Sequence, residues 1–197
     1  YKELSVGNHL FMTIQWMLSS FANEGKAFFI AIWAAGFLLL VKSKKAKVYQ
    51  SLAVVFSVVA LLPYAGISFF SEMGIGYIDI EQCLTELPTW QTMTTQNRIA
   101  FFWWIAAVLF TLVLLWKVTG HSVFISMAFL GGIASEAVLH FSPTIYASGA
   151  RVYYLTDLMY LFIILWMVMR MDSEKKKNLF IAGAAALGII NFLSQYS

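Results

Sequence analysis

The fold is decided by residues 122–169, which read SVFISMAFLGGIASEAVLH (122–140), FSPTIYASGAR (141–151) and VYYLTDLMYLFIILWMVM (152–169). Two apolar runs flank a short polar segment, and each run is close to the roughly 20 helical residues that cross a hydrocarbon core of about 30 Å. Each run also carries one acid, Glu136 or Asp157. An ionisable side chain at the centre of a membrane helix costs about 2.5–3.5 kcal/mol on insertion scales, so it usually has a partner or a function. The two acids therefore predict a polar site within a membrane-embedded helical hairpin.

The composition of the whole chain predicts an integral membrane protein. The 197 residues are 60% hydrophobic and 12% charged, with a mean hydropathy of +0.75. Soluble domains have about 25% charged and 45–50% apolar residues. The net charge of +3 does not indicate nucleic-acid binding, because the basic residues lie in short loops between apolar runs. The single cysteine, Cys83, excludes a disulfide within the chain.

Six segments have the composition and approximate length of membrane-spanning helices, namely residues 24–41, 48–70, 99–116, 122–140, 152–169 and 178–194. Backbone groups in lipid must be paired within each segment, so these segments are expected to be helices. The sequence thus predicts an all-α, polytopic integral membrane bundle of about six transmembrane helices, forming a single domain over residues 1–197.

Residues 8–22 have a different pattern from the six apolar segments. Leu10, Ile14, Met17, Leu18 and Phe21 form an apolar stripe at helical spacing, and polar residues cover much of the remaining surface. This pattern predicts an N-terminal amphipathic helix that lies at the interface or packs on the bundle. A seventh span is the alternative.

The lysines and arginines of the short loops predict the orientation of the chain. Four basic residues fall on one side of the expected membrane: Lys2, Lys26, Arg98 and Arg151. Nine fall on the other side, which we expect to be cytoplasmic: Lys42, Lys44, Lys45, Lys47, Lys117, Arg170, Lys175, Lys176 and Lys177. Both ends of the chain are then outside. Because the chain opens with Tyr1 and no signal peptide, we expect it to be a piece of a longer protein. The one long connection, residues 71–97, is either a functional lid or a passive cap.

Polar residues converge at the outer end of the hairpin. Glu136 and His140 are four residues apart and share a helix face, and Ser142 with the following proline ends that helix. Arg151 opens the next helix, and Asp157 is six residues, or about 9 Å, deeper. If the two helices pack antiparallel, the two acids lie at similar depth. These five residues form the candidate substrate-binding site.

The same five residues are compatible with more than one chemistry. An arginine can bind a phosphate or carboxylate with two hydrogen bonds, and a buried carboxylate can act as a base or hold sugar hydroxyls. Glu136 and His140 could also ligate a metal, but two ligands are too few, so no metal or cofactor is expected. The structural alternative is a polar network that locks the two helices together.

The stretch HFSPTIYASGAR (140–151), followed by an aromatic-rich helix, resembles a hairpin in bacterial multi-pass membrane proteins related to lipid-linked-sugar glucosyltransferases of surface polysaccharide modification. The matching residues are Ser142, Pro143 and Arg151, and the pair Gly7-Asn8 is a fainter match. The resemblance implies a glycosyltransferase-like protein of the cell envelope that uses a polyprenyl-phosphate-linked sugar on the outer face of the bacterial cytoplasmic membrane.

The resemblance also implies roles for individual residues. Arg151 would bind the lipid-linked phosphate, while Glu136, His140 and Asp157 would orient it or line the pocket. The catalytic acid would lie in a preceding part of the protein, so this chain alone would not catalyse. Its expected partners are the lipid bilayer, the lipid-linked sugar and the rest of the same protein, with no nucleic acid. The alternatives are a transporter or channel domain with an intramembrane acidic path, and a structural membrane subunit.

Overall fold

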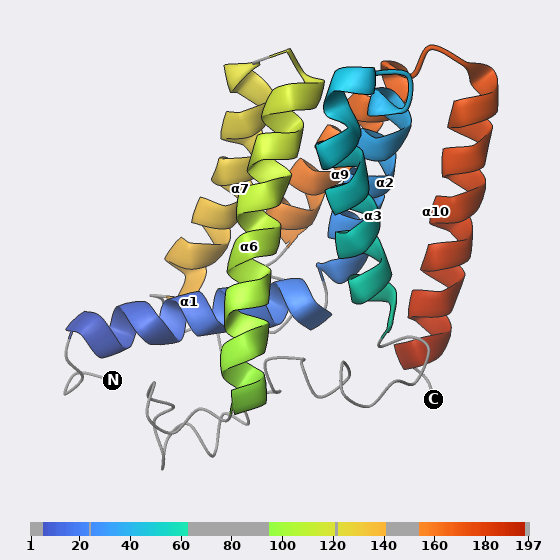
Figure 1. The fold of residues 1–197 in the computed structure, drawn as a ribbon. Helices are drawn as coiled ribbons and strands as arrows, with labels where there is room; N and C mark the ends of the chain where they lie inside the picture. The colour runs from blue at the N-terminus through green and yellow to red at the C-terminus, as the bar shows by residue number, and fades with distance from the viewer. Residues whose placement is uncertain (1–5, 24, 63–94, 121, 141–153, 196–197) are drawn as a thin grey trace.

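The structure is a computed structural model that describes residues 6–23, 25–62, 95–120, 122–140 and 154–195. Within these residues the regular elements are helices, with no strand, so the predicted all-α class is confirmed (Figure 1). The elements are α1 (Val6–Asn23), α2 (Lys26–Leu40), η1 (Lys44–Ala46), α3 (Lys47–Leu61), α6 (Thr95–Val118), α7 (Val123–His140), α9 (Tyr154–Met169) and α10 (Glu174–Gln195).

The long helices after α1 stand side by side, and successive ones reverse direction along the chain (Figure 1). α2 lies in the middle, where it contacts α3, α6, α9 and α10, while α7 pairs with α9. The six segments expected from the sequence correspond in order to α2, α3, α6, α7, α9 and α10. The expected segment 48–70 continues past α3 into residues outside the described part. Pro63, Cys83 and residues 71–94 of the expected loop also lie outside it. Residues 95–97, which were expected in that loop, instead form the start of α6.

Length and composition make α6 a candidate membrane-spanning helix. Among the described residues, the stretch Arg98–Val118 is long and apolar enough to cross a membrane by itself. α1 and α2 pass the same test only as a pair, bent by 68° at the break between them. The apolar helices Lys47–Leu61, Val123–Val138 and Tyr154–Met169 are shorter. The described part therefore contains one such helix, or two if the bent pair is a single span.

Aromatic side chains fill the centre of the bundle. Phe29 and Trp33 of α2 are fully buried, with their ring centroids 5.8 Å apart, and Phe29 also meets Trp104 and Phe129 at 5.6 and 6.0 Å. Trp33 Nε1 donates a hydrogen bond of 2.8 Å to Thr111 Oγ1 of α6. A buried indole N–H needs such a partner, so this bond both satisfies Trp33 and joins α2 to α6.

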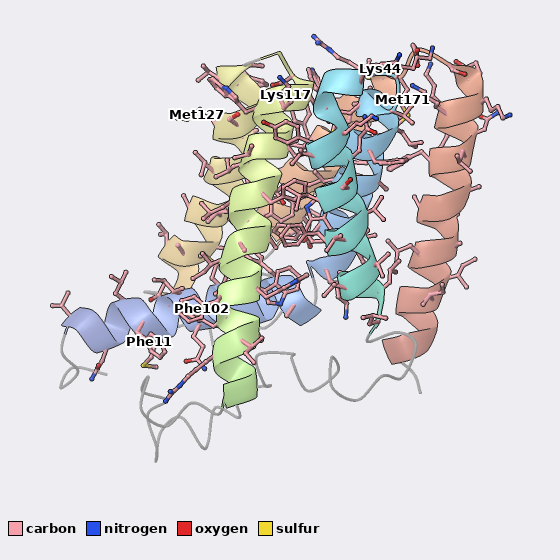
Figure 2. All side chains as sticks on the ribbon, viewed as in Figure 1. Phe11, Lys44, Phe102, Lys117, Met127 and Met171 are labelled. Carbon is pink, nitrogen blue, oxygen red and sulfur yellow. The ribbon has the colours of Figure 1, made fainter. Side chains whose placement is uncertain are left out.

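α1 lies across one end of the bundle and packs against α7 and α6 (Figure 1). The predicted helix is present, but the predicted buried face is only partly correct. Leu18 and Phe21 are buried as expected, whereas Leu10 is 54% exposed. Thr13 and Gln15 are buried instead, because α1 contacts the three helices α7, α6 and α2 rather than a single flat surface. Figure 2 shows Phe11 of α1 near the same end of the molecule as Phe102 of α6.

The α6–α7 turn depends on one glycine. Gly120 has a φ of 65°, in the left-handed region that residues with a Cβ rarely adopt. Next to it, Thr119 Oγ1 accepts a hydrogen bond of 3.1 Å from the backbone N–H of Ser122, which begins the approach to α7. The chain can therefore reverse within a few residues and place α7 beside α6.

The nine basic residues expected on one side lie in or beside the turns at a single end of the bundle. These turns join α2 to α3, α6 to α7 and α9 to α10, and Figure 2 shows Lys44 and Lys117 at this end. Asp172 links two of the turns, because its carboxylate binds Lys42 Nζ at 2.7 Å and Lys176 Nζ at 2.9 Å. We call this end of the bundle, comprising the turns 41–47, 117–123 and 170–177, the basic end.

The Asp172 pairs predict a defined pH dependence of stability. Hydrogen bonds from Lys42 and Lys176 hold the pKa of the Asp172 carboxyl well below its ordinary value of 3.8. A carboxyl with a lowered folded-state pKa stabilises the fold fully above its unfolded pKa, and this stability is lost as the pH falls towards the folded pKa. We expect Asp172→Asn to lower the unfolding midpoint modestly at neutral pH, with the difference from wild type shrinking below about pH 4.

Thermal unfolding in mild detergent across the acid range would measure this difference. Because the carboxylate is exposed, high salt should also reduce it. A difference that is the same at neutral pH and at about pH 2 would contradict the assignment.

Candidate functional site

α7 and α9 approach each other closely because Gly132 has no side chain. A Cβ built at Gly132 would stand 3.3 Å from Tyr160 Cε1 and 3.7 Å from Thr156 Cγ2. The Gly132 carbonyl accepts hydrogen bonds from Ser135 Oγ at 2.8 Å and from Thr156 Oγ1 at 3.2 Å. The two hydroxyl oxygens are themselves 3.2 Å apart. Small and hydroxyl residues of this kind are typical of closely packed helices in membranes.

The contact between Ser135 and Thr156 sets the relative depth of the two acids. Glu136 follows Ser135 on α7 and Asp157 follows Thr156 on α9, so the antiparallel pairing places both acids at a similar level. Both lie towards the end of the bundle opposite the basic end, since α7 ends at His140 and α9 begins at Tyr154. Glu136 is buried, with 1% of its surface exposed, and Asp157 is half-buried.

Tyr160 completes this group from the next turn of α9. Its side chain is 1% exposed, and its hydroxyl lies within electrostatic range of both Glu136 and Asp157. The hydroxyl oxygen is buried without a hydrogen-bond partner among the described residues. Buried polar groups normally have partners, so this phenol is a candidate for contact with a ligand. We call Glu136, Asp157 and Tyr160 the acidic site.

Asp157 lies close to the described start of α9. In the described part α9 begins at Tyr154, which places Asp157 in the first turn of the helix. A carboxylate there is favoured by the helix dipole, typically by about 0.3–1 kcal/mol. The helix dipole therefore lowers the free-energy cost of a carboxylate at Asp157. The buried carboxyl of Glu136 is the more costly of the two acids.

The structure brings together only part of the predicted site. Glu136 and Asp157 share one level of the bundle, and His140 is the last residue of α7, although its side chain is not described. Ser142 and Arg151 lie outside the described residues. The expected convergence of Arg151 with the acids therefore stays a prediction.

Ser135, Thr156 and Tyr160 were not among the candidate residues predicted from the sequence. From the sequence, Tyr160 is expected to be one of several packing aromatics, because three tyrosines occur within residues 153–160. One signal was available: each acid is directly preceded by a hydroxyl residue, as Ser135-Glu136 and Thr156-Asp157. Such a hydroxyl can bond to the backbone of a neighbouring helix and fix the level of the acid beside it.

Aromatic rings pack around Tyr160 of the acidic site. The Tyr160 ring lies 5.7 Å from Phe29 and 5.5 Å from Phe129, measured between centroids, and 6.1 Å from Phe28. α1 crosses the end of the bundle that is opposite the basic end (Figure 1). The side chain of Gln15 on α1 is buried, and its Oε1 has no hydrogen-bond partner among the described residues. The site therefore combines carboxylates and a phenol with an apolar, aromatic wall.

The groups of the acidic site can hold a hydroxyl-bearing ligand. Across the described residues, no group of three or more His, Cys, Asp or Glu side chains is placed to hold a metal ion. Carboxylates accept hydrogen bonds from hydroxyl groups, and a phenol can donate or accept. Aromatic walls suit the apolar faces of a bound ligand.

Comparison with known proteins adds no relative from which a role could be transferred. No protein-family model matches the chain, and no curated protein or solved structure matches it. The functional argument therefore depends on the chain's own residues and contacts.

Proposed function

We propose that the chain is a multi-pass membrane protein in which α2, α3, α6, α7, α9 and α10 all cross the bilayer. Large apolar side chains on the outer surfaces of these helices support this proposal, among them Val58, Leu109, Phe124, Leu165 and Ile181. Soluble monomers rarely expose apolar patches larger than a few hundred Å², whereas lipid contact requires such a surface. The concentration of lysines at one end supports placing that end in the cytoplasm.

The shorter helices are compatible with this placement. α2 and α3 have 15 residues each and α9 has 16, which corresponds to about 22–24 Å. A short span can be accommodated by local thinning of the bilayer and by lysines that extend towards the interface. Lysines flank α2, α3 and α10 at the basic end.

For the acidic site, we propose the outward-facing recognition of a sugar linked to polyprenyl phosphate, within a bacterial glycosyltransferase-like protein that modifies a cell-surface glycan. The observation that carries this proposal is the burial of Glu136 and of the Tyr160 hydroxyl, which has no hydrogen-bond partner among the described residues, towards the end opposite the lysines. Carboxylates and a phenol would hold sugar hydroxyls, the expected role of Arg151 would be to bind the phosphate, and the remaining part of the protein would supply catalysis.

A second role, locking α7 to α9, is favoured by a specific observation. Ser135, Thr156 and the Gly132 carbonyl form a compact hydrogen-bonded contact between these helices. Because these groups already join the helices, the lock does not need the carboxylates. The two roles can therefore be separated by mutation.

A transport path through the bundle has less support. Phe129 and Tyr160 lie closer to the basic end than the acid of their own helix, and their buried rings pack against each other and against Phe29. A path for ions or protons needs polar groups that continue across the membrane. The aromatic packing is more consistent with a site that opens towards one face.

The experiment compares Glu136→Gln with Thr156→Val in the full-length protein. If Glu136 holds substrate, Glu136→Gln should reduce transfer of radiolabelled sugar from its polyprenyl-phosphate carrier by about tenfold to a hundredfold, the effect of one hydrogen bond to a charged group. Its unfolding midpoint should stay close to wild type. Thr156→Val removes the hydroxyl of the lock and should lower stability while transfer is retained.

Normal transfer by Glu136→Gln in membranes would reject the glycosyltransferase-like role. Loss of stability in Glu136→Gln together with unchanged transfer per folded molecule would assign Glu136 to the lock instead. Proton- or ion-coupled flux in liposomes that is lost in Asp157→Asn would favour the transport alternative.

A further inference from the structure

A groove between α10 and the pair α2–α3 is separate from the acidic site. It has a volume of about 540 Å³, within the range of roughly 300–1,000 Å³ typical of small-molecule sites. Its lining includes several small residues: Ala31 and Ala34 of α2, Ala53 of α3, and Gly183 and Ala184 of α10. Among the described residues that line it, Ser57 alone has a polar side chain. The groove can therefore take an apolar, elongated occupant.

The length of the groove matches one leaflet of a bilayer. On α10 its lining runs from Leu179 to Ile190, which is about 16 Å along the helix axis. Half of a hydrocarbon core of about 30 Å is about 15 Å. A single acyl chain of a lipid in the leaflet on the basic side would thus lie along most of the groove.

The end of the groove nearest the turns is strongly cationic. The segments 42–47 and 172–177 contain seven lysines and two acids, and the bond between Lys42 and Asp172 holds these two segments together. Lys176 and Lys177 precede Leu179 on α10 by less than one helical turn. Lys44, Lys47 and Lys175 are exposed and make no ion pair with the described residues. An apolar groove that leads to unpaired lysines is complementary to a lipid with an anionic headgroup.

We propose that this groove binds an anionic phospholipid of the leaflet on the basic side, with one acyl chain between α10 and α2–α3 and the headgroup at the lysines of 42–47 and 175–177. The inference depends on the proposed membrane placement but not on the glycosyltransferase-like role. The bound lipid fills the space between α10 and its neighbours, and the headgroup draws together the two segments that Asp172 already links.

Two glycines of α10 offer a matched pair of variants. A Cβ added at Gly183 or at Gly188 meets no atom within 4 Å, so leucine at either position should be accepted by the fold. Gly183 lines the groove, whereas Gly188 is not among its lining residues. Gly183→Leu should therefore occupy the space of the acyl chain, and Gly188→Leu should leave it open.

The test uses the purified chain in phosphatidylcholine vesicles that contain a trace of spin-labelled phosphatidylglycerol or spin-labelled phosphatidylcholine. Electron paramagnetic resonance measures the fraction of each lipid that the protein immobilises. We expect wild type and Gly188→Leu to prefer phosphatidylglycerol by about fivefold or more, an effect comparable to that of one lysine near a headgroup. Gly183→Leu should lose this preference. The triple variant Lys44→Gln, Lys47→Gln, Lys175→Gln should lose it without changing the immobilised phosphatidylcholine.

Equal affinity of wild type for the two lipids, or the same result for both glycine variants, would overturn the proposal. A change in oligomer mass in Gly183→Leu, measured by light scattering, would also overturn it, because a second copy would then occupy the groove. Vesicle flotation after a carbonate wash separates the two proposals. Protein that does not float with the vesicles would reject the membrane placement, whereas protein that floats without a lipid preference would reject the lipid site alone.

Discussion

Replacing Gly132 with leucine should destabilise the protein severely, whereas the same replacement at Gly131, one residue earlier on α7, should be tolerated. A Cβ at Gly132 would lie 3.3 Å from Tyr160 Cε1 and 3.6 Å from Met159 Cβ. The remaining leucine carbons would have to displace α9, at a cost of about 1–3 kcal/mol for overpacking. The hydrogen bond from Thr156 to the Gly132 carbonyl, 3.2 Å long, would be lost with the displacement.

Gly131 is a control with nearly the same sequence context. It is exposed, and a Cβ added there meets no atom within 4 Å. Replacement should even favour the helix, since glycine in a helix interior is about 0.8–1.0 kcal/mol less favourable than alanine. Circular dichroism during thermal unfolding in mild detergent would measure both variants. Similar unfolding midpoints for Gly131→Leu and Gly132→Leu would mean that α7 and α9 do not pack through Gly132.

The contrast between these glycines marks the limit of what the sequence predicts. Apolar runs between short basic loops located the helices, because run length and composition are properties of each segment alone. The sequence also indicated that small residues thin the helix around Gly131 and Gly132. It could not decide which glycine faces α9, because that depends on the rotation of one helix against another. The rotation is fixed by contacts such as Ser135 with Thr156.

For the candidate site too, the sequence predicted some residues and could not predict others. Glu136 and Asp157 stand out because acids are rare in apolar runs, and the antiparallel hairpin that brings them to one level follows from the short connection between their helices. Tyr160 could not be distinguished from neighbouring tyrosines without knowing which side of α9 faces Phe29 and Phe129. On α1, Leu10 is exposed and Gln15 is buried for a similar reason. The helix packs against α7, α6 and α2, whereas the periodicity of the sequence assumes a single apolar surface.

Truncating Trp33 should produce the largest loss of stability of any change considered for this protein. Its side chain is fully buried, with ring centroids of Phe29, Phe56 and Trp103 at 5.8, 5.4 and 6.3 Å. Trp33→Ala would leave a large cavity at the contact of α2, α3 and α6, and replacements of this type cost about 3–5 kcal/mol. Trp33→Phe should reduce stability much less, because it keeps an aromatic ring in the same place. Its main loss is the 2.8 Å hydrogen bond to Thr111, which is worth about 1 kcal/mol.

Trp116→Ala is the informative control, because this tryptophan of α6 is 40% exposed on the surface of the bundle. In a bilayer, lipid chains are as apolar as the side chains, so helices associate through packing rather than through the hydrophobic effect. With the helices placed in a bilayer as proposed, lipid would refill the space left by Trp116 but would not enter the cavity left by Trp33. Denaturant titration of vesicle-embedded protein should therefore give a much larger loss for Trp33→Ala than for Trp116→Ala. Equal losses would mean that the aromatic cluster around Trp33 does not hold α2 in the bundle.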